Sequence, residues 1–360
     1  MILVINAGSS SLKAAIFARD LTQITALSVS EIGGASTLRT TGPSRPISAP
    51  THAAAIAHIT QALTSQGHFS GQSPITAVAH RVVHGGAKLT APAALTPAII
   101  AEIRACIPLA PLHNPANMAA IDALASLGLP QFASFDTAFH ATNPPVSTTY
   151  ALPLSEREKG IRRYGFHGLS YASLITQLDP LPAKLLAFHL GNGASLCAIL
   201  NGQSVATTMG YSPLDGLTMG TRAGAIDPMA VLQLVRDYGT QGADDLLTRQ
   251  SGLKGLAGTN DMATLLGRND PAARFAIDHF CYWAARHAGS AITAMGGLDA
   301  MAFTGGIGEN APLIRDKITA HLSWLGPKPV HIIAAQEERQ IARDALALMT
   351  SQNPASANPI

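Results

Sequence analysis

A glycine- and serine-rich segment near the start of this chain has residue types that could bind phosphate. Residues 7–11 read AGSSS, and Lys13 follows two positions later. Glycine lets a ligand approach the backbone, and hydroxyl and amide groups can donate hydrogen bonds to phosphate oxygens. The segment matches neither the P-loop nor the dinucleotide fingerprint. By itself it is more typical of an ordinary hairpin turn.

Two later segments repeat this combination. Residues 189–193 read HLGNG after an apolar run, and residues 303–310 read FTGGIGEN, which leads to a helix predicted to start near Asn310. A helix start behind glycines is suited to an anion or to the sugar end of a nucleotide. A tight turn explains each segment separately, but three of them in one chain favour phosphate binding over coincidence.

Arginines and histidines also occur among glycines, in HRVVHGG (80–86), YGFHG (164–168) and MGTRAG (219–224). A guanidinium binds carboxylate and phosphoryl oxygens through two parallel hydrogen bonds. We therefore expect Arg81 and Arg222 to hold the two ends of a phosphoryl transfer. Single histidines in such surroundings are more often structural, which is our reading of His80, His84 and His113.

Carboxylates are candidates at two places. Asp136 ends an apolar run in SFDTAFH, where a surface aspartate is not expected, so it could bind magnesium or orient a substrate. Glu337 and Glu338 also read as the start of a last helix, a common position for acidic residues.

Two similar sets of strands must position these residues. Apolar runs at 2–6, 12–17 and 24–30 predict strands around the first turn, and runs at 185–190, 195–200 and 204–208 predict strands around the second. Asn201–Gly202 is a hairpin-turn pair. Recurrence about 185 positions apart indicates a duplicated α/β domain.

The remaining pattern predicts helices at 53–66, 96–106, 114–127, 228–238 and 272–295, and a surface loop at 34–50. A chain of 360 residues suggests roughly two domains of about 150 residues. We expect domains at 1–149 and 150–336, a helix at 337–349 that packs back on the first domain, and a flexible tail at 350–360.

Composition excludes several classes of protein. A formal charge of +2 provides no basic excess for a nucleic acid, and Arg162–Arg163 is an isolated basic pair. Cys106, Cys197 and Cys281 are widely separated, which argues against a disulfide framework or a zinc site. No signal peptide and no apolar run of 18 residues is evident, so we expect a soluble, cytoplasmic protein without membrane or nucleic-acid partners.

Taken together, the motifs resemble those of the acetate kinase family, which belongs to the duplicated, actin-like sugar kinase superfamily. The matching segments occur in order over nearly the whole chain: VINAGSSSLK (4–13), HRVVHGG (80–86), APLHNP (110–115), FDTAFH (135–140), YGFHG (164–168), HLGNGAS (189–195), MGYSPLDGL (209–217) with MGTRAG (219–224), and FTGGIGEN (303–310).

The resemblance implies a fold and an activity. The fold would be α/β, with duplicated ribonuclease H-like (actin-like ATPase) domains, mixed sheets flanked by helices, and a cleft between the domains. The activity would be that of an acetate kinase, reversible transfer of the γ-phosphoryl group of ATP to acetate, giving acetyl phosphate and ADP with Mg²⁺ or Mn²⁺. A homodimer is also implied.

Two alternatives remain open. The acceptor could be propionate, butyrate or another short-chain carboxylate, because one methylene changes binding by only ~1–3 kcal/mol. From another class, a non-catalytic nucleotide-binding switch would keep the turns but tolerate loss of Arg81, Arg222 or His167. All three residues are present.

The resemblance also implies a role for each matching position. Transition-state and catalytic roles fall on Asp136, His167 and Arg222, and the metal would be bound by Asn6 and Glu337. The carboxylate would be bound by Arg81, in a pocket shaped by Val83, Leu112, Phe166 and Pro213. The nucleotide and its phosphates would be bound by Ser9, Ser11, Lys13, His189, Leu190, Gly191, Asn192, Gly193, Asp261, Met262, Ala263, Gly306, Ile307, Gly308, Glu309 and Asn310.

Physical reasoning narrows the role of Asp136. A carboxylate substrate with a pKa near ~4 is already ionised at neutral pH, so no general base is required. Asp136 should instead position the metal or the substrate. The sequence also departs from the family at three places: Ala225 replaces an expected Asp, Ala263 stands where an arginine is usual, and Ala335–Gln336 replace the usual Thr/Asn lead into the glutamates.

Overall fold

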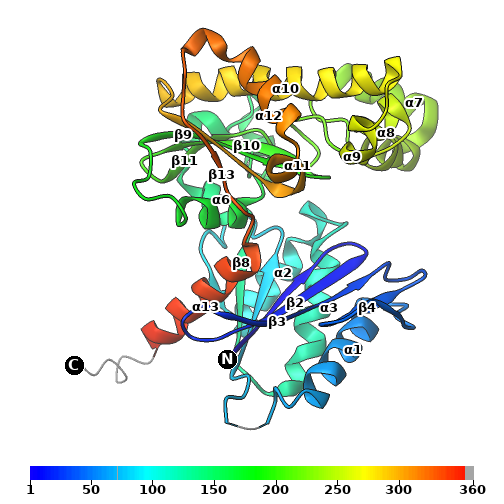
Figure 1. The fold of residues 1–360 in the computed structure, drawn as a ribbon, viewed down its shortest axis with the longest axis vertical. Helices are drawn as coiled ribbons and strands as arrows, with labels where there is room; N and C mark the ends of the chain where they lie inside the picture. Colours follow the sequence, from blue (N-terminus) through cyan, green and yellow to red (C-terminus); the bar gives the residue numbers. More distant parts are fainter. Residues whose placement is uncertain (71, 353–360) are drawn as a thin grey trace. The chain divides into compact units, whose positions relative to one another are not determined.

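A computed structural model describes residues 1–70 and 72–352 of the chain (Figure 1). Contacts between residues divide it into two compact units. Unit 1 comprises Met1–Phe139 together with the chain from Gln336 onward, and unit 2 comprises His140–Ala335. The tail predicted at 350–360 lies outside the described residues from 353 onward.

Unit 1 is built on an eight-stranded sheet of order β5-β4-β3-β2-β1-β6-β8-β7. Strands β1, β6 and β8 are parallel, and β1, β2 and β3 form an antiparallel meander. The strands are β1 (Ile2–Ala7), β2 (Ser11–Phe17), β3 (Gln23–Ser30), β4 (Thr37–Arg39), β5 (Arg45–Pro46), β6 (Ala77–Val82), β7 (Ala93–Ala94) and β8 (Gln131–Phe135).

The two faces of this sheet differ because successive side chains on a strand point in opposite directions. One face buries apolar residues such as Ile5, Leu12 and Leu38 against α1 (His52–Ser65) and α3 (Asn114–Leu124). The other face carries the buried apolar residues Ile2, Val4 and Phe17 besides polar residues such as Asn6 and Lys13. Helix α13 (Glu337–Gln352) covers this face at β1, β6 and β8. The remaining helical segments are α2 (Pro97–Ala105), η1 (Ile107–Leu109) and η2 (Ala125–Leu127), and η3 (Ala138–Thr142) continues from unit 1 into unit 2.

Unit 2 is built on a five-stranded sheet of order β11-β10-β9-β12-β13. Its strands are β9 (Lys184–Leu190), β10 (Ala194–Leu200), β11 (Gln203–Thr207), β12 (Ala300–Thr304) and β13 (Val330–Ile332). Its helical segments are α4 (Pro145–Thr148), α5 (Leu154–Arg157), α6 (Gly168–Ile175), α7 (Pro228–Asp245), η4 (Leu246–Gln250), α8 (Gly252–Ala257), α9 (Met262–Leu266), α10 (Pro271–Met295), α11 (Gly305–Asn310), α12 (Pro312–His321) and η5 (Ser323–Leu325).

The longest helix, α10, packs on β9, β10 and β11, and its ends follow from local sequence. The Asp270 side chain accepts a hydrogen bond from the Ala273 amide, and Pro271 occupies the first turn. These are the preferred residues at a helix start. Gly296 ends the helix with a φ of 68°, a conformation that glycine adopts without strain.

The duplication predicted from the sequence is confirmed by topology. In unit 1 the central strands run in the order β3-β2-β1-β6-β8, and in unit 2 they run β11-β10-β9-β12-β13. In each unit an antiparallel meander is followed by two strands parallel to its first strand. Asn201 and Gly202 have φ values of 50° and 81°, as the predicted hairpin requires. Mixed sheets flanked by helices confirm the predicted fold class.

One local prediction is wrong, and one short helix was not predicted. Segment 34–50 contains the short strands β4 and β5, whose few residues give no periodic signal. The helix expected to start near Asn310 is α12, which begins at Pro312, and the short helix α11, from Gly305 to Asn310, precedes it and was not predicted. At Gly305, with a φ of 80°, a side chain would lie 2.7 Å from the Leu190 carbonyl oxygen, so this position requires glycine.

The described helices contain none long and apolar enough to cross a membrane. All three cysteines are buried and unpaired.

Candidate active site

Three predicted residues meet where the parallel strands of unit 1 end. Asn6 lies near the end of β1, Arg81 near the end of β6, and Asp136 directly after β8. The register pairs Ile5 with His80, so the next residues, Asn6 and Arg81, are neighbours on one face. Parallel strands end at the same edge of a sheet, and ligand sites of α/β proteins form there.

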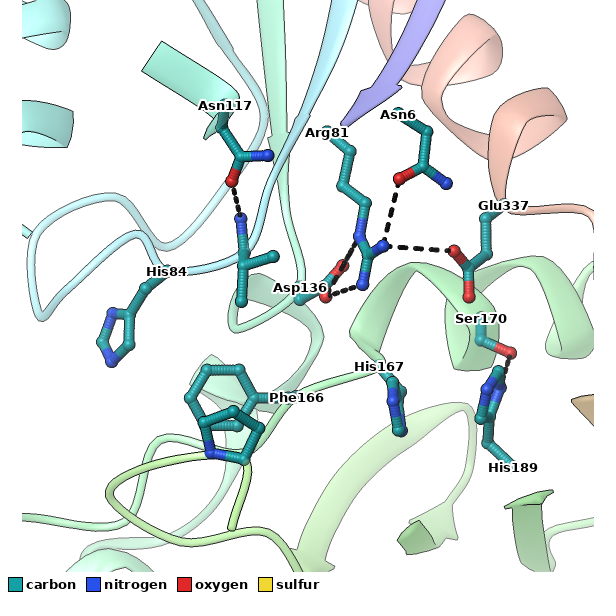
Figure 2. Close-up of polar contacts among 12 residues, drawn as sticks. Asn6, Arg81, His84, Asn117, Asp136, Phe166, His167, Ser170, His189 and Glu337 are labelled. Carbon is teal, nitrogen blue, oxygen red and sulfur yellow. Dashed lines mark hydrogen bonds and ion pairs between the residues drawn. The ribbon is translucent and has the colours of Figure 1, made fainter. Parts of the chain in front are cut away.

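The Arg81 guanidinium is the centre of this cluster (Figure 2). Its Nε donates to Asp136 Oδ1 at 3.0 Å, and its Nη2 pairs with Asp136 Oδ2. Its Nη1 donates to Asn6 Oδ1 at 3.0 Å and lies 4.0 Å from Glu337 Oε2. The exposed fractions of the Arg81 and Asp136 side chains are 18% and 2%. The charge of the buried Asp136 carboxylate is therefore compensated by the planar Arg81 guanidinium, which binds it through two nitrogen atoms.

Burial and neighbouring charge act against each other on this pair. Burial raises the pKa of the Asp136 carboxyl, the Arg81 guanidinium opposes that rise, and the nearby Glu337 adds to it. Burial disfavours the charged form of Arg81, but Asp136 and Glu337 more than offset this and raise its pKa. Arg81 remains a cation at every relevant pH.

The donor set around Asn6 fits a hard divalent cation. Asn6 Nδ2 donates to Glu338 Oε1 at 3.0 Å, so a second carboxylate joins Glu337 at the start of α13. When the carboxylates of Asp136, Glu337 and Glu338 are ionised, they and the Arg81 guanidinium together carry a formal charge of −2. No group of three or more His, Cys, Asp or Glu side chains suited to a metal occurs in the part of the chain that is described. Magnesium commonly uses one or two carboxylates together with phosphates and water, so this set is sufficient.

The first glycine turn joins β1 to β2 as a hairpin. The Gly8 amide donates to the Ser11 carbonyl oxygen at 2.8 Å, and Ser9 is exposed. Lys13 pairs with Asn6 in the register, so the two side chains share a face. Lys13 also lines an open cavity of about 390 Å³ together with Ser28, Arg39 and Glu338. The structure therefore places Lys13 next to the Asn6 cluster.

Two predicted histidines of unit 2 stack on each other. The rings of His167 and His189 lie 4.2 Å apart at an angle of 28°. The Nδ1 atom of His167 bonds Ser195 Oγ at 2.9 Å. That of His189 bonds Ser170 Oγ at 2.8 Å, as Figure 2 shows. Each ring is thereby fixed by a hydrogen bond at its Nδ1 atom.

Arg222 lies beside the second glycine turn. Its Nη1 donates to the Pro213 carbonyl oxygen at 3.0 Å. A side chain at Gly193 would lie 3.6 Å from Arg222 Nη1 and 3.2 Å from His167 Nε2. The structure thus brings His167, Arg222 and the turn together, and a glycine at position 193 keeps the space between them open.

A cavity of about 400 Å³ collects most of the predicted nucleotide contacts of unit 2. The Asn192 carbonyl oxygen accepts a hydrogen bond from the Gly220 amide at 3.0 Å, which fixes the turn on one side of this cavity. The lining residues are Gly191, Asn192, Asn260, Asp261, Met262, Ala263, Leu266, Gly306, Ile307, Asn310 and Ala311.

Other predicted nucleotide residues have structural contacts instead of cavity positions. Leu190 is fully buried in β9, and Gly308 packs against Phe303. Glu309 Oε1 accepts hydrogen bonds from the Gly305 and Ala335 amides, both at 3.0 Å. These three residues support the loop through contacts inside unit 2.

Asp261 caps its own helix. Its carboxylate accepts hydrogen bonds from the Ala263 and Thr264 amides at the start of α9. The backbone that follows is thereby held in place at the cavity wall.

The residues predicted to shape the carboxylate pocket belong to both units, and each unit is described separately. In unit 1, Val83 is buried and follows β6, whereas Leu112 is 40% exposed before α3. In unit 2, Phe166 is buried and Pro213 accepts the hydrogen bond from Arg222.

His80 and His84 are structural, as expected. His80 Nε2 bonds Gln131 Oε1 at 2.6 Å, and His84 Nδ1 accepts from the Gly86 amide at 2.9 Å. Burial lowers the pKa of each to about 4, so both rings are neutral at pH 7.

Sequence reasoning missed residues that support the site. Glu338 bonds Asn6, Asn260 donates to Asn192 Oδ1 at 3.0 Å, and Ser195 supports His167. Only Glu338 gave a signal, as the second member of the acidic pair. The others are polar residues whose partners are distant in the sequence.

Comparison with known proteins identifies a family. A model of the Acetokinase family matches residues 1–351. The acetate kinase of Rhodopseudomonas palustris (strain ATCC BAA-98 / CGA009) is 50% identical over 263 residues, which cover 70% of this chain and 66%, just under two thirds, of that protein. The acetate kinase of Nitrobacter hamburgensis is 40% identical over 397 residues, covering 99% of this chain and 98% of that protein.

A solved structure gives the same result. The structure of a propionate kinase from Francisella tularensis subsp. tularensis SCHU S4 superimposes on this chain with a TM-score of 0.90 at 33% sequence identity. The superposition covers 95% of this chain and 98% of the propionate kinase chain. On the family match and on identity over nearly the whole length, this chain belongs to the Acetokinase family.

Proposed function

We propose that this protein is an acetate kinase, which reversibly transfers the γ-phosphoryl group of ATP to acetate to give acetyl phosphate and ADP. The observation that carries the proposal is the half-buried Arg81 guanidinium at the end of β6, between Asp136, Asn6 and Glu337. It is a cation fixed in position at the edge of a sheet, next to oxygen donors suited to a metal. A carboxylate acceptor needs such a cation and needs no general base.

Unit 1 supplies the acceptor side of the reaction. Arg81 binds the acetate carboxylate, and the buried Val83 side chain contacts the methyl group. Asp136 holds the guanidinium in orientation through its two oxygens. Asp136 is therefore a positioning residue for acetate, since acetate is already ionised.

Asn6 and Glu337, together with Glu338, would hold Mg²⁺ or Mn²⁺. Support comes from their oxygen donors and from the net negative charge of the cluster. The metal, when bound, neutralises developing charge on the phosphoryl oxygens.

Unit 2 supplies the nucleotide side. Support comes from the cavity lined by Gly191, Asp261, Ile307 and Asn310, which fits a base and ribose. His167 and Arg222, beside Gly193, would stabilise the transferring phosphoryl group. Phosphoryl transfer depends mainly on alignment and charge stabilisation, which fixed guanidinium and imidazole groups provide.

The function is tested by incubating the protein with ATP, Mg²⁺ and hydroxylamine in the presence of acetate, propionate or butyrate. Acyl phosphate is trapped as a coloured hydroxamate, and we expect kcat/KM to be highest for acetate. A higher value for propionate or butyrate would assign the protein to the alternative substrate. Absence of hydroxamate with every acid, despite ATP binding, would favour the non-catalytic switch.

Lys13 gives a prediction for the phosphate side of unit 1. Lys13→Ala is expected to lower kcat/KM for ATP by about 10- to 100-fold, the worth of one charge-assisted hydrogen bond. The side chain is exposed, so the thermal unfolding temperature should not change. Arg45→Ala is the control. Arg45 pairs with the core residue Leu38, so it lies on the face of the sheet opposite to that of Lys13. Equal activity losses in both variants would contradict the role of Lys13.

We also propose a cytoplasmic homodimer. Support for the dimer comes from apolar side chains exposed on two helices of unit 2, Met229 and Leu232 on α7 and Phe275 and Tyr282 on α10. Support for the location comes from three unpaired cysteines, which are typical of a reducing compartment.

A further inference from the structure

The four residues that follow β6, residues 83–86, have an unusual pattern of hydrogen bonds. Every one of their backbone N–H groups donates to a side-chain atom. Val83 donates to Asn117 Oδ1 at 3.1 Å, His84 to Asn114 Oδ1 at 3.1 Å, Gly85 to Thr137 Oγ1 at 3.1 Å, and Gly86 to His84 Nδ1 at 2.9 Å. The chain has left the sheet but stays largely buried, so each N–H requires a partner inside the protein.

Two of these partners come from one face of α3. Asn114 and Asn117 are three positions apart and are each at most 1% exposed. Asn114 uses its second polar atom as well, because Nδ2 donates to the His84 carbonyl oxygen at 3.0 Å.

Asn117 connects two strands that carry proposed ligands. Its Oδ1 accepts from Val83, two residues after Arg81, and its Nδ2 donates to the Ala7 carbonyl oxygen at 2.8 Å, one residue after Asn6. One amide therefore fixes the distance between the ends of β1 and β6.

The path of residues 83–86 is also sterically defined. A side chain at Gly85 would lie 2.4 Å from the Leu89 carbonyl oxygen and 3.1 Å from the Phe135 ring. Thr137, which bonds the Gly85 amide, directly follows Asp136. The segment is thus held by α3 on one side and by the end of β8 on the other.

We infer that Asn117 and Thr137 are positioning residues that determine carboxylate recognition, by fixing the backbone that carries Arg81 and Val83. The inference rests on the proposed binding of acetate by Arg81 and Val83. A small shift of Val83 would change the room for the alkyl group, whereas a shift of Arg81 would weaken binding of any carboxylate. Loss of the positioning bonds should therefore change both affinity and the preference between acids.

Thr137 allows a matched pair of variants. Thr137→Val has the same shape but no acceptor for the Gly85 N–H, and Thr137→Ser keeps the hydroxyl. We expect Thr137→Val to lower kcat/KM for acetate about tenfold or more, and to alter its ratio to kcat/KM for propionate. Thr137→Ser should restore both values to near wild type.

Asn117 allows a graded pair. Asn117→Asp keeps the acceptor for Val83 and removes the donor to Ala7, whereas Asn117→Leu removes both bonds. We expect the larger loss of kcat/KM for acetate in Asn117→Leu. If that variant does not fold, the Thr137 pair decides the question.

Ser36→Ala is the control for a loss of stability alone. The buried Ser36 hydroxyl donates to the Glu31 carbonyl oxygen at 2.9 Å within the same unit, away from the strands of the site. This variant should melt earlier yet keep the acetate-to-propionate ratio. Folded Thr137→Val with wild-type kinetics would overturn the inference but leave the function intact, and a wild-type protein that phosphorylates no acid would overturn both.

Discussion

Arg222→Ala is expected to reduce kcat by about 10³- to 10⁵-fold while ATP binding is retained. The guanidinium is fixed by its hydrogen bond to the Pro213 carbonyl oxygen and lies near Gly193 in the nucleotide turn. There it can stabilise charge that develops on the phosphoryl group only in the transition state. Loss of such an interaction lowers kcat and spares ground-state binding.

The measurement combines steady-state kinetics with calorimetric titration of ATP. Arg222→Lys is the informative companion variant, because it keeps the charge but loses the planar pair of donors. We expect it to recover only a small part of kcat. A near-normal kcat in Arg222→Ala would remove this residue from the mechanism, and a lost ATP affinity would move its role to the ground state.

Arg81→Ala is expected to have two separable effects. Acetate binding should be lost, so kcat/KM for acetate should fall by more than about 10²-fold, because a charge-assisted pair of hydrogen bonds contributes about 3 kcal/mol or more. Stability should fall by about 3–5 kcal/mol, because the Asp136 carboxylate, 2% exposed, is left buried without its cation.

A double variant separates these effects. Arg81→Ala with Asp136→Asn removes the unpaired charge, so much of the stability should return, as measured by denaturant unfolding. Acetate phosphorylation should not return, because the guanidinium is still missing. Recovery of activity together with stability would show that Arg81 acts only in folding and does not bind the substrate.

The strands and turns of this protein could be predicted because their signals are local. Apolar runs interrupted by AGSSS and GNGA identify β1, β2, β9 and β10, and Asn201–Gly202 identifies a hairpin from two residues alone. Candidate ligands such as Arg81 and Arg222 could be chosen because a guanidinium among glycines has few structural uses. Strands of two or three residues, such as β4 and β5, carry no such signal and were missed.

The supporting contacts could not be predicted because they join residues far apart in the sequence. Asn117 bonds Val83 across 34 positions, and Asn6 bonds Glu338 across 332. A buried asparagine on a helix looks like any other polar residue until the strands beside it are known. Glu309 shows a related limit of sequence reasoning. Its motif predicts a contact with the nucleotide, whereas in the structure its Oε1 atom accepts hydrogen bonds from the Gly305 and Ala335 amides.

The sequence by itself therefore determined the duplicated strand pattern, the glycine turns and the kind of chemistry, because residue type and short-range periodicity specify these. Only the tertiary structure decided that Arg81 is held by Asp136 and Asn6, and that the N–H groups of residues 83–86 depend on side chains of α3 and of the segment after β8. The reason is that burial creates a requirement for partners, and the chain meets it with whichever polar side chains the packing of β1, β6, β8 and α3 brings within hydrogen-bonding distance.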